Sequence, residues 1–249
     1  MASHRQVFIA VFDLLFLKMD YQYTYLLMGL VFLAIWLALY IWRKNTRKEM
    51  VVMSLVFAFA GPLADVLYTR DWWRPLTLTK TAVGPESIFV AFMIGGIASV
   101  VYEDVFKKRL RIHKANKTME VREDFALFLI LAISAILFFG VSNIMNFNSL
   151  IATITALLIP TIVIWIRRKD LIIDSLGTGV LLVIIASLVY TILEFLTPGW
   201  ISAFWYFKNV PHIIVGNLPL DDLIWYFLAG LFIGPLYEYW QEGKLIKDE

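Results

Sequence analysis

"LDDLIWYFLAGLFIGPLYEY", residues 220–239, is an apolar segment that opens with two aspartates almost at its first residue. A helix that crosses a bilayer needs about 20 mainly apolar residues, and this segment meets that length. A similar element, "PESIFVAFMIGGIASVVYED", occupies residues 85–104, at an offset of 135 residues (221 − 86 = 135). Under this offset Glu86 aligns with Asp221, and most of the apolar positions coincide. The two segments therefore indicate an internal repeat.

The composition is typical of a membrane protein. Of the 249 residues, 60% are hydrophobic and 17% are charged, and the mean hydropathy is +0.74. This apolar share exceeds the ordinary range of soluble domains. Cysteine is absent, which excludes disulfides and thiolate metal sites, and we expect neither a metal nor a cofactor. Residues 1–20 contain a short apolar run broken by Asp13, and this pattern predicts an interfacial segment rather than a signal peptide.

Seven apolar runs predict seven transmembrane helices. They cover residues 22–42, 50–68, 86–106, 124–142, 149–166, 171–196 and 220–240. The repeat divides them into a first three-helix repeat at 22–106, a connecting helix at 124–142 and a second three-helix repeat at 149–240. One connecting helix gives both repeats the same orientation. The predicted fold is therefore an all-α integral membrane protein, a single domain over 1–249 built as 3+1+3 parallel internal repeats.

Basic joints between the spans predict the orientation of the chain. The segments 43–48, 107–117 and 167–170 are rich in lysine and arginine, whereas the joints at 143–148 and 197–219 carry a single charge between them. By the positive-inside rule the basic joints are cytoplasmic, which places the N-terminus outside and the C-terminus in the cytoplasm. Insertion alone explains these basic residues, so we expect the bilayer as a partner and no nucleic acid. The expected location is the cell membrane of a prokaryote.

Carboxylates within the spans are the candidate catalytic groups. A charge inside a bilayer costs at least about 2.5–3.5 kcal/mol on insertion scales, so such an acid is a functional candidate. Asp65, Glu86, Asp174, Glu194 and the Asp221/Asp222 pair qualify by position, and all of them except Asp174, which sits one turn past the inner boundary, are the catalytic candidates. Glu86 and Asp221 closely follow prolines, and the first turn of a helix can hold a carboxylate on its unpaired N–H groups, so capping is an alternative for both. Glu103, Asp174 and Glu238 lie near the cytoplasmic ends, where we expect them to reach headgroup water.

Two adjacent aspartates allow two roles. Asp221 and Asp222 project about 100° apart around a helix, so one can cap the helix while the other faces the bundle interior. If both face a low dielectric, desolvation and mutual repulsion leave at least one as a neutral acid near pH 7. A neutral carboxylic acid in an apolar cavity is a proton donor. Asp65 and Glu194 occupy similar places near the outer ends of their spans, and we expect each to converge with the acids of the following helix.

Aromatic residues cluster at the outer ends of the spans. The candidate substrate-binding residues are Trp72, Trp73, Trp200, Trp205, Trp225 and Tyr226. One interpretation is an interfacial aromatic belt. The other is that some ring faces line a cavity and stabilise positive charge through cation–π attraction.

This arrangement resembles the membrane carotenoid (lycopene) cyclase family of bacteria, archaea and fungi, over roughly residues 22–240. An acid near a span's end, a tryptophan-bearing outer loop and a proline with acids that opens an apolar helix all occur twice. "NLPLDDLIWYF", from Asn217, is similar to the family's Pro-x-Glu-Glu-x-x-Phe-Phe element, and "VGPESIFVAF", from Val83, is a weaker copy. The chain departs from the family pattern in having aspartates for glutamates, and Ser87 where a second acid is common.

The resemblance implies a redox-neutral cyclisation of the ψ end group of lycopene, or of a related polyene, to an ionone-type ring. An acid protonates the terminal alkene, a neighbouring double bond attacks the tertiary cation, and a base removes a proton from the ring. Carried over by position, Glu86, Asp221 and Asp222 are the acid and base candidates, with Asp65 and Glu194 as their partners. No cofactor is implied.

Three other functions fit parts of the pattern. Another isoprenoid cyclase or a hydratase would use the same acid, and water that reached the cation would give an alcohol. A small seven-helix transporter would need a polar central pathway, whereas these acids cluster at one end of the helices. A retinal-binding photoreceptor would need a lysine in the middle of the last span, and none stands between Asp222 and Glu238.

Overall fold

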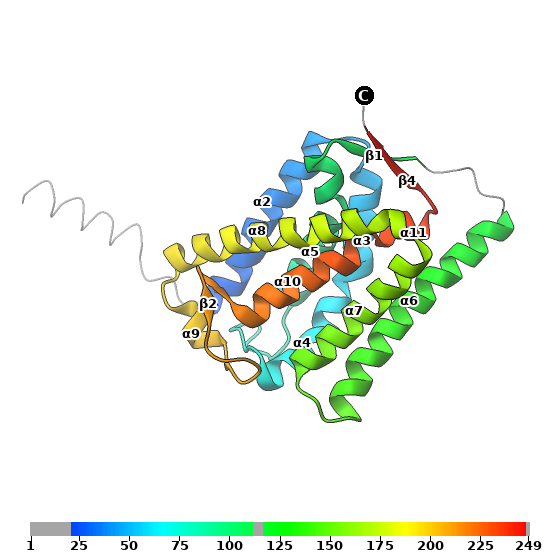
Figure 1. Ribbon diagram of the computed structural model, residues 1–249. Helices are drawn as coiled ribbons and strands as arrows, with labels where there is room; N and C mark the ends of the chain where they lie inside the picture. Colours follow the sequence, from blue (N-terminus) through cyan, green and yellow to red (C-terminus); the bar gives the residue numbers. More distant parts are fainter. Residues whose placement is uncertain (1–20, 112–116, 248–249) are drawn as a thin grey trace, which may run out of the picture.

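The computed structural model describes residues 21–111 and 117–247, which form a bundle of long helices (Figure 1). The helices are α2 (Thr24–Trp42), α3 (Arg47–Ala58), α4 (Ala60–Asp71), α5 (Pro85–Val105), α6 (Lys117–Asn143), α7 (Ser149–Arg167), α8 (Ile172–Leu196), α9 (Trp200–Phe204), α10 (Leu220–Ile233) and α11 (Leu236–Trp240). Six helical segments are long and apolar enough to cross a membrane, and a bent pair, α3 with α4, makes up to seven. The protein is therefore a mostly helical, multi-pass membrane protein. The predicted interfacial segment 1–20 lies outside the described residues.

The second predicted span is bent rather than straight. The prediction of one helix over 50–68 is wrong, because α3 and α4 meet at an angle of 43°. Gly61 and Pro62 stand in the first turn of α4. Proline has no N–H to donate to the preceding turn and its ring crowds that turn, which is the usual cause of a kink.

Serines of neighbouring helices bind carbonyl groups that prolines leave free. Pro160 of α7 cannot donate to the carbonyl of Ala156, and that carbonyl accepts a hydrogen bond of 2.8 Å from Ser134 Oγ of α6. The carbonyl of Leu231, freed by the proline between α10 and α11, accepts one of 2.6 Å from Ser175 Oγ of α8. Water cannot satisfy these groups inside a bilayer, so the serines also hold the helices together.

The helices α5 and α10 occupy the centre of the bundle. α2 and α3 pack against α5, while α7 and α8 pack against α10, and α6 lies along α7 (Figure 1). Gly230 allows α10 to approach α8 closely, because a Cβ there would lie 2.6 Å from Gly179 Cα and 2.8 Å from the Thr178 carbonyl oxygen. Small residues permit this kind of backbone contact between membrane helices.

Two short antiparallel ribbons correct the prediction of an all-α fold. β1 (Lys108–Arg111) follows α5 and pairs with β4 (Lys244–Lys247), which follows α11. β2 (Ile214–Val215) pairs with β3 (Leu218–Pro219) just before α10. These strands are too short to produce a readable alternation of apolar and polar residues, and tertiary contact between distant segments creates the β1–β4 pair.

Candidate active site

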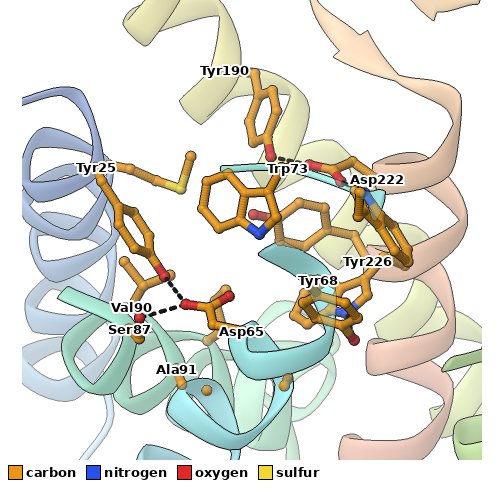
Figure 2. A pocket seen from close by; sticks show the side chains of 16 residues that line it. Tyr25, Asp65, Tyr68, Trp73, Ser87, Val90, Ala91, Tyr190, Asp222 and Tyr226 are labelled. Carbon is orange, nitrogen blue, oxygen red and sulfur yellow. Dashed lines mark hydrogen bonds between the residues drawn. The ribbon is translucent and has the colours of Figure 1, made fainter. Parts of the chain in front are cut away.

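A cavity of about 90 Å³ lies between α2, α4, α5, α8 and α10, and two carboxyl groups face it. They belong to Asp65 of α4 and Asp222 of α10, and both side chains are buried. Most of the remaining wall is aromatic. The rings that line the cavity are those of Tyr25, Tyr68, Trp72, Trp73, Tyr190, Trp225 and Tyr226. Figure 2 shows the two carboxyl groups approaching from different helices, with Trp73 drawn between them.

Asp65 accepts hydrogen bonds from two hydroxyl groups on other helices. Its Oδ2 accepts from the Tyr25 hydroxyl of α2, at 3.2 Å, and from Ser87 Oγ in the first turn of α5 (Figure 2). Asp65 is only 4% exposed, so these hydroxyls take the place that water would have. A hydroxyl can donate or accept, so this set of partners suits Asp65 with or without a proton.

Asp222 accepts hydrogen bonds on both of its oxygens. Oδ1 accepts from the indole nitrogen of Trp72, at 3.0 Å, and Oδ2 accepts from the Tyr190 hydroxyl of α8. An indole N–H can only donate, so at least one oxygen of Asp222 must act as an acceptor. Asp222 thus receives a donor on each oxygen, an arrangement that can stabilise an ionised carboxylate.

Each half of the chain has one acid and one hydroxyl partner on two different helices, but the order of acid and hydroxyl along the chain is reversed between the halves. Ser87 aligns with Asp222 under the offset of 135 residues (222 − 87 = 135). In the first half the acid, Asp65, stands on the helix that precedes α5, and α5 supplies the hydroxyl. In the second half α10 supplies the acid, and the earlier long helix α8 supplies the hydroxyl of Tyr190. The cavity thus has one acid–hydroxyl pair from each half.

Backbone contacts between two distant loops position the tryptophans of the cavity. Trp73 and Trp205 form an antiparallel bridge, and the Tyr206 N–H donates to the Trp72 carbonyl at 2.9 Å. The ring of Trp73 meets that of Tyr25 edge-on, with centroids 4.9 Å apart. The segment after α4 and the segment after α9 therefore close this end of the bundle together.

An apolar groove of about 320 Å³ adjoins the cavity. The two share six lining residues, Gly61, Ala64, Tyr68, Ala91, Ile94 and Trp225. From there the groove runs between α3, α4 and α5 on one side and α6, α7 and α10 on the other. Its polar groups are bonded to one another, since the Tyr68 hydroxyl contacts Thr153 Oγ1 at 3.0 Å and accepts from Trp225 Nε1 at 2.9 Å. The surface left for a ligand is therefore mainly apolar.

Comparison with known families identifies the second half of this structure. Residues 148–240 match the family model described as Lycopene cyclase. The match covers less than half of the chain, so what it shows is a similarity of this C-terminal part to the lycopene cyclase family. No curated protein and no solved structure matches the chain. The matched segment includes Asp222, Tyr190 and two further rings of the cavity wall, so one acid–hydroxyl pair lies within the family match. Asp65 and its partners precede that segment.

The other three predicted acids bind backbone N–H groups outside the cavity lining. Glu86 Oε1 accepts from the N–H of Leu78 at 2.6 Å, and Asp221 Oδ1 accepts from the N–H of Asp222 at 3.0 Å. Asp221 thus binds a first-turn N–H of its own helix, as the capping alternative expects, whereas Glu86 binds the N–H of a loop residue that precedes α5. Glu194 accepts from the N–H of Gly199 at 2.9 Å, in the turn after α8. Glu194 and Asp65 both stand near the ends of their spans, as predicted, but only Asp65 lines the cavity.

Four of the six predicted aromatic residues line the cavity, namely Trp72, Trp73, Trp225 and Tyr226. Trp200 and Trp205 form a layer behind them, with ring centroids 5.0 and 6.0 Å from that of Tyr190. Both are buried, as are Trp72 and Tyr226. These rings build the wall of an internal site, as the cavity interpretation expects, rather than an exposed interfacial belt.

The sequence reasoning missed three hydroxyl groups of the site, those of Tyr25, Ser87 and Tyr190. The internal repeat contained a signal for Ser87, because it aligns with Asp222. Tyr25 and Tyr190 stand within apolar spans where a tyrosine is unremarkable, and only the packing of α2 and α8 brings their hydroxyls to the acids.

Proposed function

We propose that this protein belongs to the lycopene cyclase family along its whole length and is a carotenoid cyclase that closes the ψ end group of lycopene, or of a related polyene, into an ionone-type ring. The observation that carries the proposal is the pair of buried acids, Asp65 and Asp222, that face one aromatic cavity continuous with an apolar groove. The reaction is redox-neutral and moves a proton within the hydrocarbon. It therefore belongs to the intramolecular lyases or isomerases, and the product has the mass of the substrate.

Asp65 is the proposed proton donor. It transfers its proton to the terminal carbon–carbon double bond, which leaves a tertiary carbocation on the chain. Its hydrogen-bond partners, Tyr25 and Ser87, are hydroxyls that remain bonded whether Asp65 is protonated or ionised. A proton donor needs this tolerance, since it passes through both states in each turnover.

Asp222 is the proposed base. The electrons of a neighbouring double bond attack the cation and close the six-membered ring, which moves the positive charge onto the ring. Asp222 then removes a proton from the carbon beside the charge, and the electrons of that C–H bond form the ring double bond. The donors Trp72 and Tyr190 support the ionised state that this step requires. The proton must return to Asp65 before the next turnover.

The aromatic wall supports the carbocation stage. Ring faces attract positive charge by cation–π interaction, and the effect is larger where water is excluded. Trp73, Trp225 and Tyr226 line the cavity, and a second layer of tryptophans backs it. Exclusion of water also favours cyclisation over hydration, because water would capture the cation as an alcohol.

The apolar groove is the proposed site of the remaining polyene chain. It leaves the cavity beside Ala64 and Trp225 and passes the helix α6, whose Ala135 and Phe139 line it. A groove that joins an acid cavity fits a hydrocarbon that is anchored at one end better than it fits the polar pathway of a transporter.

Two parallel three-helix repeats joined by α6 remain the proposed architecture. In support, two arginines make the same contacts in both halves. Arg43 donates to the carbonyls of Glu103 and Lys108, and Arg168 donates to those of Glu238 and Gly243, each acceptor pair being related by the offset of 135. We also propose an outer N-terminus and a cytoplasmic C-terminus, with the cavity toward the outer leaflet, on the basis of the basic joints.

The first test is expression of the chain in a lycopene-accumulating bacterial host, with pigment analysis by chromatography and mass spectrometry. A cyclase gives a yellow-shifted product of unchanged mass. A product heavier by one water would make the protein a hydratase, and untouched lycopene beside membrane-inserted protein would refute lycopene as the substrate.

The roles of the two acids are separable with deuterated water. Cyclisation in D₂O should place one deuterium in the ring for each end group that closes. Asp65→Asn should abolish deuterium incorporation and turnover together. Asp222→Asn should still permit protonation, so any trapped water adduct or rearranged alkene should carry deuterium. A deuterated product from Asp65→Asn would refute the assignment of the donor.

A further inference from the structure

Four buried carboxylates gather at the other end of the bundle, away from the proposed catalytic cavity. Glu49 of α3, Glu103 of α5 and Glu238 of α11 are 3%, 1% and 0% exposed, and Asp174 of α8 is 3% exposed. The prediction that Glu103, Asp174 and Glu238 reach headgroup water is wrong. Their helices pack so that these residues face the bundle interior instead.

The three glutamates are close enough to bind one ion. One carboxylate oxygen from each of Glu49, Glu103 and Glu238 lies within 4.8 Å of the other two. Two oxygens bound to the same ion are separated by at most two ion–oxygen bond lengths. This limit is about 4.6–5.2 Å for Ca²⁺ and about 4.0–4.2 Å for Mg²⁺. Separations of up to 4.8 Å fall within the limit for Ca²⁺. Ca²⁺ also accepts several carboxylates at one site, whereas Mg²⁺ usually keeps several waters and binds one or two carboxylates, so Ca²⁺ is the better match.

The second observation is the lack of hydrogen-bond partners for oxygens that point into this cluster. Within the described part of the chain, both carboxylate oxygens of Glu238 are buried without a partner, as are Oε1 of Glu49 and Oδ2 of Asp174. Buried carboxylate oxygens in proteins are normally hydrogen-bonded, paired with a base or bound to a metal. These oxygens have unused capacity for a ligand that carries positive charge.

The side chains around Glu238 are mainly acidic. Asp174, Glu49 and Glu103 all act on Glu238, and all three are acids. The base Arg168 also lies nearby, where it donates to the backbone carbonyl of Glu238 at 3.3 Å and pairs with the carboxylate of Asp170 at 2.7 Å. Repulsion among several carboxylates in a low dielectric is strongly unfavourable, and a divalent cation would relieve it.

We propose that Glu49, Glu103 and Glu238, with Asp174 beside them, form a binding site for one divalent cation of calcium size. The donor atoms are all carboxylate oxygens, which hard cations such as Ca²⁺ prefer. They come from α3, α5, α11 and α8, so the ion would join helices of both halves of the chain. The site is separate from the proposed cyclase chemistry and does not depend on it.

The test is calcium binding by the full chain in detergent after treatment with EDTA, measured by equilibrium dialysis against CaCl₂ and by the melting temperature. One Ca²⁺ per chain is expected, with a melting temperature that rises with CaCl₂. Glu238→Gln and Glu49→Gln should each weaken binding at least tenfold. Asp170→Asn is the matched control, because it removes one carboxylate that is exposed and paired with Arg168 at 2.7 Å.

Several results would overturn the site. One is that the folded, EDTA-treated chain binds no Ca²⁺, which would mean that bound protons, and not a metal ion, neutralise the carboxylates. Another is that binding persists unchanged in both glutamine variants, which would place the ion elsewhere. Tighter binding of MgCl₂ than of CaCl₂ would refute the size argument. If Glu238→Gln does not fold, Glu49→Gln decides, because it removes a different ligand of the same site and keeps the size of the side chain.

Discussion

Tyr190→Phe should slow ring formation by about 10- to 150-fold. The change removes the hydroxyl that donates to Asp222 and keeps the ring that packs against Trp200 and Tyr226. A hydrogen bond to a charged group contributes about 1.5–3 kcal/mol, and each 1.36 kcal/mol is tenfold in rate. Tyr190 is only 2% exposed, so water should not replace the lost donor. Asp222 would then be less often ionised and less often available as the base.

The assay is the initial rate of ring formation from lycopene by the purified enzyme in lipid vesicles, with product quantified by chromatography. Tyr21→Phe is the matched control, because its hydroxyl donates to the carbonyl of Pro198, at 2.8 Å, away from the cavity. The control should retain the wild-type rate. If Tyr190→Phe stays within twofold of wild type while Asp222→Asn is inactive, the reasoning about the hydroxyl is refuted. If both variants are active, Asp222 is not the base.

Three further predictions concern capping, packing and the groove. Glu86→Gln and Asp221→Asn should retain most of the cyclase rate and lower the melting temperature, since both side chains bind backbone N–H groups. Complete loss of activity in a folded variant would show that the acid concerned takes part in catalysis. Gly230→Ala should destabilise the protein by about 1–3 kcal/mol through overpacking against α8, whereas Gly140→Ala, with nothing within 4 Å of the new Cβ, should be neutral or slightly stabilising in the same melting experiment. Ala135→Trp should raise KM for lycopene by narrowing the groove and leave turnover of a short ψ-ended terpenoid unchanged, and equal effects on both substrates would refute the groove as the polyene site.

The spans were predictable because the bilayer demands long apolar runs, and most of the helix ends lie within a few residues of the predicted ones. The Gly61-Pro62 pair is a sequence signal for the bend between α3 and α4, but a search for apolar runs does not detect it. The β1–β4 ribbon had none, because its two strands lie far apart in the chain and each has four residues.

The site was predictable only in part, because sequence position near a span's end does not determine which way a side chain points. Asp65 and Asp222 line the cavity as the sequence suggested, while Glu86 and Glu194 bind N–H groups of neighbouring loops and do not line it. The burial of Glu103 and Glu238 could not be read from the sequence, since a glutamate near a membrane boundary can face either water or a neighbouring helix. Helix packing decides between these outcomes, and it is a property of the whole bundle.

The placement of the two acids has a stereochemical consequence. Asp65 and Asp222 belong to different halves of the chain and reach the cavity from different walls (Figure 2). A ring formed between them would gain a proton from Asp65 of α4 on one face, and it would lose a different proton to Asp222 of α10 on another side. The end group would then fold in one handedness only, so the deuterium introduced from D₂O should occupy one of the two stereochemically distinct hydrogen positions at its carbon. A racemic label would mean that the end group rotates freely in the cavity before it is protonated.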